Sequence, residues 1–164
     1  MSHNERMFRG EGVRMRRILI VLAVAAASAG APSLAATPAQ ERAFVDTYRK
    51  AFEAKDAATL HSLLYTKGAD PKALGFYRMM TTVGMGAKVA SIALVDLTPE
   101  DRARANRSMP GVDGKMLRLS LEAVKKLVIR VETKTADATS TGTSEVFVGE
   151  QDGKLWIPVP APAP

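Results

Sequence analysis

The side chains best suited to acid–base chemistry gather near the start of the chain. Tyr48, His61 and Tyr65 fall within residues 45–65, and Asp70 follows them. Histidine can give or take a proton near neutral pH, and a phenol can donate a hydrogen bond to a group that becomes negative. We therefore take Tyr48, His61 and Asp70 as the candidates for catalysis.

Each of these residues also has a purely structural explanation. Asp70 directly precedes Pro71, as the N-cap residue of a helix often does. Tyr48 falls on the apolar face of a predicted helix, where its hydroxyl would need one partner. His61 has no carboxylate three or four residues away, which leaves it as a helix-surface histidine. The sequence favours these structural roles over catalytic ones.

Most other chemistries find no support in the sequence. The chain has no cysteine and two histidines, too few ligands for a zinc site, so we expect no metal and no cofactor. It has no Gly-x-Ser-x-Gly motif and no phosphate-binding glycine loop. Basic residues are not interleaved with aromatic ones, and the basic run at 102–107 is typical of a solvated turn. Nucleic acid is therefore not an expected partner.

The first 35 residues have the three parts of a secretory signal peptide. An arginine-rich stretch at 14–17 precedes the uncharged run 18–31, and a segment of mostly small residues follows at 32–35. The apolar run is shorter than the roughly 20 residues of a membrane-spanning helix, which favours a cleaved peptide over an uncleaved anchor.

We predict cleavage after Ala35, because Ser33 and Ala35 put small residues at both positions that a signal peptidase reads. Cleavage after Ala36 is nearly as good, and Met15 is an alternative start. The mature protein would then be periplasmic or secreted, with no membrane attachment after cleavage.

Charge and cysteine content indicate what kind of surface and core the mature chain has. Five arginines and two glutamates of the segment 1–35 account for half of the formal net charge of +6. Residues 36–164 therefore keep an ordinary mixed surface. They lack the disulfides common in small exported domains, but they are long enough to bury one core. We expect a single domain over 36–160 and a disordered tail at 161–164.

Cap signals and apolar periodicity predict three helices in the first half of the mature chain. The first follows a capping box at Thr37. The second follows Asp56 and ends near Gly68, and the third runs from Asp70 to Gly84.

Strand patterns follow from residue 88 onward. We expect a strand at 88–97, a surface helical turn at 98–107, a loop at 108–115, strands at 116–121 and 125–134, a polar connection at 135–143 and a hairpin at 144–159. Asp152-Gly153 is a strong hairpin turn. This order predicts an α+β fold, with three N-terminal helices packed on one face of a curved antiparallel sheet of four to five strands.

The stretch FVDTYRKAFEAKDAATLHSLL (44–64) and the C-terminal strands 125–159 resemble the cone-shaped, cystatin-like superfamily of nuclear transport factor, ketosteroid isomerase and SnoaL-like proteins. The resemblance covers most of residues 37–160. It implies that Tyr48 could donate to an oxyanion and that Asp70 could move a proton, as in the family's isomerases. The second, protonated carboxylic acid of that oxyanion hole has no counterpart here.

Apolar side chains of the same region could instead line a ligand pocket. Methionines are enriched between residues 79 and 116, and methionine fills irregular apolar spaces or lines adaptable pockets. The candidate ligand-binding residues are Tyr48, Phe52, Tyr77, Met80 and Trp156.

The sequence therefore favours an exported module that binds a small apolar ligand or a protein partner over an enzyme. One alternative is an isomerase- or dehydratase-type enzyme that uses Tyr48, Asp70 or His61. The other is an assembly protein that forms a homodimer through the sheet face of Lys126, Val128, Arg130 and Glu132.

Overall fold

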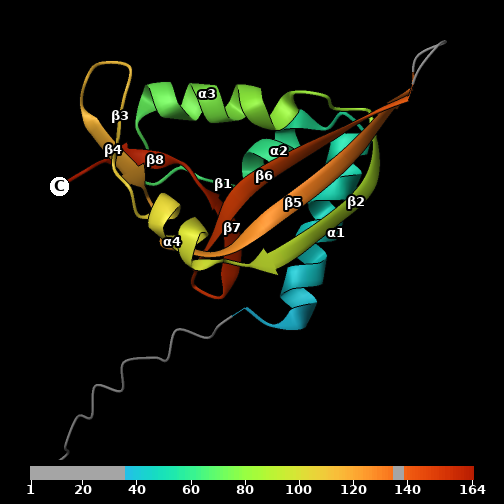
Figure 1. Ribbon diagram of the computed structural model, residues 1–164, viewed down its shortest axis with the longest axis horizontal. Helices are drawn as coiled ribbons and strands as arrows, with labels where there is room; N and C mark the ends of the chain where they lie inside the picture. The colour runs from blue at the N-terminus through green and yellow to red at the C-terminus, as the bar shows by residue number, and fades with distance from the viewer. Residues whose placement is uncertain (1–35, 135–138) are drawn as a thin grey trace, which may run out of the picture. The chain divides into compact units, whose positions relative to one another are not determined.

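Helices dominate the first half of the described chain and strands the second half, which confirms the α+β class (Figure 1). The structure is a computed structural model that describes residues 36–134 and 139–164. Its helices are α1 (Pro38–Glu53), α2 (Ala57–Ser62), α3 (Pro71–Thr82) and α4 (Pro99–Ala105). Its strands are β1 (Leu64–Tyr65), β2 (Lys88–Asp96), β3 (Met109–Pro110), β4 (Met116–Leu119), β5 (Ala123–Lys134), β6 (Thr139–Gln151), β7 (Lys154–Pro158) and β8 (Pro160–Pro162).

The strands form two sheets, where the sequence predicted one antiparallel sheet. The larger sheet has the order β1-β7-β6-β5-β2, and the smaller has the order β3-β4-β8. The larger sheet is mixed, because β1 runs parallel to β7 with Leu64 opposite Ile157. The backbone N–H of Ile157 donates to the Leu63 carbonyl at 2.9 Å, so the chain leaving α2 is drawn into the sheet. For this reason α2 ends at Ser62 and not near Gly68 as predicted.

The predicted helix starts are confirmed by their caps. Thr37 and Gln40 form the capping box of α1, and Asp56 and Asp70 cap α2 and α3. The turn expected after Thr98 is a seven-residue helix, α4, with its own capping box. The structure thus describes four helices where three were predicted.

Helix α1 covers one face of the larger sheet. Tyr48 and Phe52 are buried there against Leu127 and Ile129 of β5. Each large apolar side chain that is fully buried in this way contributes about 1.5–3 kcal/mol. Since successive residues of a strand point to opposite faces, Lys126 lies on the other side of β5. That side is covered at one end by α4, which packs through its own small apolar cluster.

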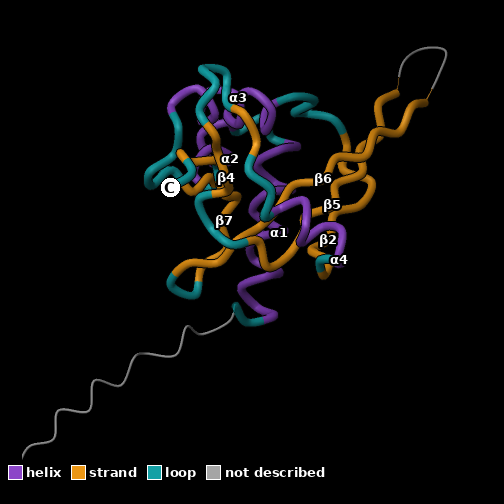
Figure 2. Tube along the Cα trace, turned by 60° about the vertical axis from the view of Figure 1, so that its left-hand side comes forward, coloured by secondary structure: helices purple, strands orange, loops and turns teal. Residues whose placement is uncertain are grey.

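The outer ends of β5 and β6 form a two-stranded ribbon. β2 pairs with β5 as far as Glu132, so residues 133–134 of β5 pair with residues 139–140 of β6 beyond the end of β2. The part of β6 from residue 139 to 145 is exposed. Figure 2 shows this ribbon extending past the helices. The prediction of a polar connection at 135–143 is therefore wrong for 139–143, while 135–138 lie outside the described residues. These serines and threonines show no apolar alternation because all of them are exposed.

The end of the chain is a strand and not the predicted disordered tail. Val159 and Pro160 are buried, and β8 pairs antiparallel with β4. Proline has no N–H to donate and is tolerated in an edge strand, which is the place of β8 in its sheet. The alanines still supply donors, since the N–H of Ala163 bonds to the Met116 carbonyl at 2.8 Å.

A chain that ends at Val159 should be less stable than the full chain. It loses β8 and the Pro160 carbonyl, which accepts the backbone N–H of Asp70 at 2.9 Å. We expect the free energy of unfolding to fall by about 1–3 kcal/mol, because a buried N–H is left without its partner. A chain that ends at Ala163 should match the full chain in urea unfolding followed by circular dichroism. Equal stability of the chain that ends at Val159 would contradict the pairing.

Candidate functional site

An apolar pocket of about 260 Å³ lies where α1, α3 and the inner faces of β5 and β6 meet. Helix α1 and β5 supply residues that are part of the main core, and α3 supplies the opposite wall. The lining residues are Tyr48, Phe52, Phe76, Tyr77, Met80, Thr81, Val83, Ile129, Val131, Ser144, Glu145 and Val146.

Polar contacts fix α3, which forms one wall of the pocket, at its start and beyond its end. At its start, the Asp70 carboxylate accepts the N–H groups of Lys72 and Ala73, each at 2.9 Å. Beyond its end, the N–H of Gly86 donates to the Phe52 carbonyl of α1 at 2.8 Å. Gly86 has a φ of 85°, a left-handed conformation that residues with a Cβ rarely adopt, so this turn needs glycine.

Three apolar side chains of α3 and its end form the mouth of the pocket. Phe76, Met80 and Val83 are 54%, 50% and 62% exposed. Their spacing places them on one side of the helix. Exposed apolar residues that are contiguous and border a hollow are typical of a binding surface.

Two tyrosines contribute phenol groups to the pocket wall, beside the hydroxyl-bearing residues Thr81 and Ser144. Burial raises the pKa of Tyr48 to about 12 and also raises the pKa of Tyr77, so both phenols stay neutral at physiological pH. Within residues 36–134 and 139–164, neither hydroxyl has a hydrogen-bond partner. The fully buried unpaired side-chain atoms of this part of the chain are Ser120 Oγ and Glu150 Oε1, so the phenol oxygens keep some access to solvent. Both hydroxyls can therefore donate to a bound molecule.

The structure brings together four of the five residues predicted to bind a ligand. Tyr48, Phe52, Tyr77 and Met80 line the pocket, whereas Trp156 lies elsewhere. Its ring packs edge-on against Tyr65 at 5.9 Å between centroids, and the Lys154 ammonium lies 3.9 Å from its centroid.

Alternation along β7 explains the position of Trp156. Leu155 and Ile157, on either side of it, are buried in the core. The side chain between them must then point to the opposite face of the strand. The expectation that Trp156 belongs to the pocket is therefore corrected.

The three candidate catalytic residues do not converge. Tyr48 is in the pocket, but Asp70 is the N-cap of α3 and is not among the lining residues. His61 lies on α2, where its Nε2 atom is 3.2 Å from the Arg78 carbonyl oxygen of α3. Asp70 and His61 thus hold α3 in position, and neither lies where it could act with Tyr48.

Several lining residues were missed in the sequence. Phe76 and Val83 carry a helical spacing with Met80 that could have identified them. Ile129 and Val131 alternate within the predicted strand 125–134, which places them on one face. Nothing local shows that α3 stands over them. The pairing of β5 with β6, which brings Ser144 and Val146 beside these residues, is equally invisible in a single stretch of sequence.

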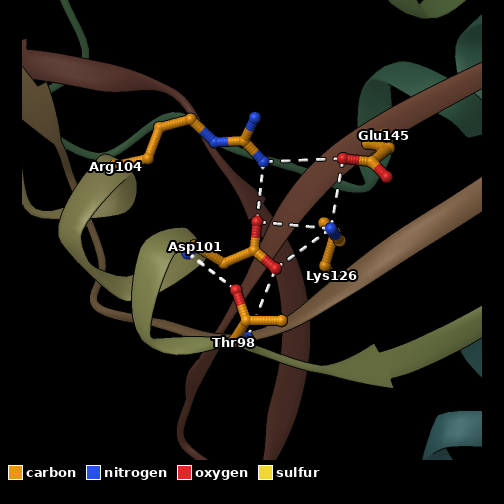
Figure 3. A network of polar contacts seen from close by, with 5 residues as sticks. All are labelled: Thr98, Asp101, Arg104, Lys126 and Glu145. Carbon is orange, nitrogen blue, oxygen red and sulfur yellow. Dashed lines mark hydrogen bonds and ion pairs between the residues drawn. The ribbon is translucent and has the colours of Figure 1, made fainter.

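A cluster of charged side chains surrounds Lys126, whose side chain lies on the face of β5 opposite to that of its buried neighbour Leu127 (Figure 3). The Lys126 ammonium lies 3.0 Å from Asp101 Oδ2 and 3.1 Å from Glu145 Oε2. Arg104 reaches Asp101 Oδ1 at 2.7 Å, and Thr98 shares the capping box with Asp101. The side chains of Asp101 and Lys126 are only 8% and 13% exposed. The cluster fastens α4 to β5 and β6.

This cluster has the electrostatics of a structural clamp. Hydrogen bonds to Asp101 and Glu145 raise the pKa of Lys126, and the hydrogen bond from Lys126 lowers the pKa of Asp101. A lysine that stays charged is neither a base nor a nucleophile. These contacts reduce the face that was predicted to form a dimer, because Lys126 is already paired with Asp101 and Glu145. Arg130 of the same face is exposed.

Neither a cluster of metal ligands nor a membrane-spanning helix is present among the described residues. No group of three or more histidine, aspartate or glutamate side chains in 36–134 and 139–164 could hold a metal ion. No helix within those residues is long and apolar enough to cross a membrane.

Comparison with known proteins gives little more. No protein-family model and no curated protein matches the chain. Among solved structures, the chain is similar to the helical cell shape determining protein Pgp2 from Campylobacter jejuni, with 11% identity and a TM-score of 0.37. The similarity covers 70% of this chain and 37% of that one, so the chain spans little more than a third of that protein. A similarity of this size assigns neither family nor function, and the SnoaL-like resemblance stays a prediction.

Substitution of Asp101 should separate the clamp from an ordinary surface ion pair. Asp101→Asn leaves the buried Lys126 with one carboxylate fewer, so we expect the melting temperature to fall by several degrees. Asp96→Asn is the matched control, because Asp96 also pairs with a lysine, Lys125, at 2.8 Å but is 88% exposed. It should change the melting temperature by about a degree or less. Equal losses would show that the clamp is only a surface feature.

The pH dependence of the melting temperature of the wild type and of Asp101→Asn tests the sign of the Asp101 contribution to stability. The folded-state pKa of Asp101 is lowered, so its stabilising effect is present above the unfolded pKa of about 3.9. It is lost as the pH falls through the folded pKa. The difference in melting temperature between wild type and Asp101→Asn should therefore be full at pH 7 and shrink below about pH 4. A difference that does not change with pH would contradict the ion pairing.

Proposed function

We propose that the mature chain is an exported binding module that holds one small apolar molecule in the pocket under α3. The observation that carries this proposal is the pocket itself. It is open at a mouth formed by exposed apolar side chains, and two neutral phenols lie in its wall. The proposed export is supported by the composition of residues 14–35.

The size and polarity of the pocket restrict the class of ligand. A cavity of about 150 Å³ accepts benzene, so the 260 Å³ seen here suits a molecule of about two fused rings or an equivalent branched chain. Glu145 is the charged residue of the lining, and its carboxylate is engaged by Lys126 and Arg104. An uncharged ligand with one hydrogen-bond acceptor for Tyr48 or Tyr77 fits this wall best.

A protein partner is the second candidate, and a specific observation favours it. Met79 lies on the exposed side of α3 next to the mouth and extends the apolar surface beyond the pocket. A partner helix could cover Phe76, Met79, Met80 and Val83 together. The enzyme alternative has less support, since Tyr48 has no titratable partner among the described lining residues other than Tyr77 and the paired Glu145. The assembly alternative has less support as well, because α4 and Lys126 occupy part of the sheet face.

Adjacent methionines provide a matched test of the pocket. Met80 lines the pocket and Met79 does not, although both are about half exposed on α3. We expect the uncharged probe 2-naphthol to bind the chain 36–164 at a ratio of one to one in isothermal titration calorimetry. Met80→Arg should weaken binding about tenfold or more, because it places a charge at an apolar mouth. Met79→Arg should leave the affinity within about twofold.

The outcome also distinguishes the two candidates. Equal weakening by both substitutions would show that the probe sits on the outer apolar surface, as expected for a protein-docking face. Absence of binding to the wild type would contradict the pocket proposal. Unchanged circular dichroism spectra of both variants are the control for folding.

A further inference from the structure

The first described residue is tied to the sheet by a long-range contact. The backbone N–H of Ala36 donates to Glu150 Oε2 at 2.9 Å, and Ala36 packs against the main core. Glu150 stands in β6, just before the Asp152-Gly153 turn. The same turn holds α1 a second time, since Gln40 Nε2 donates to the Gly153 carbonyl at 2.7 Å. The start of α1 is therefore fastened to the β6–β7 hairpin.

The carboxylate of Glu150 is only half satisfied in this arrangement. Its Oε1 atom is buried and has no hydrogen-bond partner within the described part of the chain. An orphaned buried carboxylate oxygen is unfavourable and needs a physical explanation. An amide nitrogen has one proton to give, whereas an ammonium has three donors and a compensating charge. Glu150 is therefore better matched to an ammonium at Ala36 than to an amide.

We propose that Glu150 is the acceptor for the α-ammonium that signal peptide cleavage after Ala35 creates on Ala36. The peptidase hydrolyses the peptide bond between the Ala35 carbonyl carbon and the Ala36 nitrogen with one molecule of water. The hydroxyl of the water bonds to the Ala35 carbonyl carbon and completes a carboxylic acid, which ionises. The Ala36 nitrogen takes up the other proton of the water and the proton released by this acid, and becomes an ammonium whose ordinary pKa is about 7.7–8.0. The ammonium keeps its bond to Oε2 and, after a small rotation, reaches Oε1.

The contact with Glu150 favours cleavage after Ala35 over cleavage after Ala36, two positions that the sequence leaves nearly equal. Cleavage after Ala36 would remove the donor to Glu150. It would also place a positive charge on Thr37, the N-cap of α1, where the helix dipole disfavours cations. The N–H of Thr37 is moreover occupied, since it donates to Gln40 Oε1 at 2.7 Å. Cleavage after Ala35 keeps both contacts and turns one of them into an ion pair.

A double-mutant cycle tests the ion pair. The four proteins begin at Ala36 or at Ser33, each with Glu150 or with Glu150→Gln, and are released from a fusion partner without extra residues. With Glu150 in place, the chain that begins at Ala36 should melt about 3–8 °C above the chain that begins at Ser33. In the Glu150→Gln pair this difference should fall to about 1 °C or less. The same difference in both pairs would overturn the ion pair.

Two further measurements keep the proposal testable if Glu150→Gln does not fold. The α-ammonium pKa of the chain that begins at Ala36, followed by NMR of the Ala36 methyl group, should lie above its ordinary value. An ordinary pKa would overturn the proposal. Intact mass of the exported protein should show Ala36 as its first residue, and Thr37 as the first residue would equally overturn it.

The inference rests on the proposed export but not on the proposed ligand. A chain recovered without cleavage would therefore overturn both the export and this site. Cleavage after Ala35 without coupling to Glu150 would overturn this site alone.

Discussion

The position of α3 depends on Asp70, and the pocket depends on the position of α3. The Asp70 carboxylate caps the helix, while its backbone N–H bonds to Pro160 of β8, so the start of α3 is fixed to the last strand of the chain. His61 and the turn around Gly86 hold the helix further along. Between these anchors, Leu74 and Tyr77 pack against the main core. A hollow remains between α3 and the strands β5 and β6, and residues of all three elements line it.

Most titratable groups around the helices and the sheet have structural roles. Asp70 and His61 position α3, Asp101 and Lys126 fasten α4, and Glu150 receives the start of the chain. A catalytic acid or base needs a pKa near the working pH and a place in the pocket, and these groups lie outside the lining. The polar side chains of the pocket wall include two phenols whose burial keeps them neutral, and the hydroxyl-bearing residues Thr81 and Ser144. Such a wall can orient an apolar molecule by a hydrogen bond, which favours binding over chemistry.

Local signals in the sequence were sufficient to predict most helices and strands, but not to predict which distant segments pair with each other. The capping residues Thr37, Asp56 and Asp70 predicted three helix starts, because a cap acts within one turn of its helix. β1 and β8 could not be predicted, since two or three residues carry no period and their pairing partners lie more than 40 residues away. Four pocket residues were found from apolar spacing on helices. Trp156 was misplaced because aromatic character does not reveal which face of a strand a side chain occupies, whereas its buried neighbours Leu155 and Ile157 do.

The most direct test of the pocket is the identity of what the protein carries when it is isolated from its own cells. The mature chain, residues 36–164, would be purified without denaturation beside its Met80→Arg variant, and small molecules released from both would be compared by mass spectrometry. We expect one uncharged apolar compound at close to one molecule per wild-type chain, strongly depleted in the variant. A wild-type protein that is consistently empty, or a compound retained equally by the variant, would contradict a ligand pocket under α3.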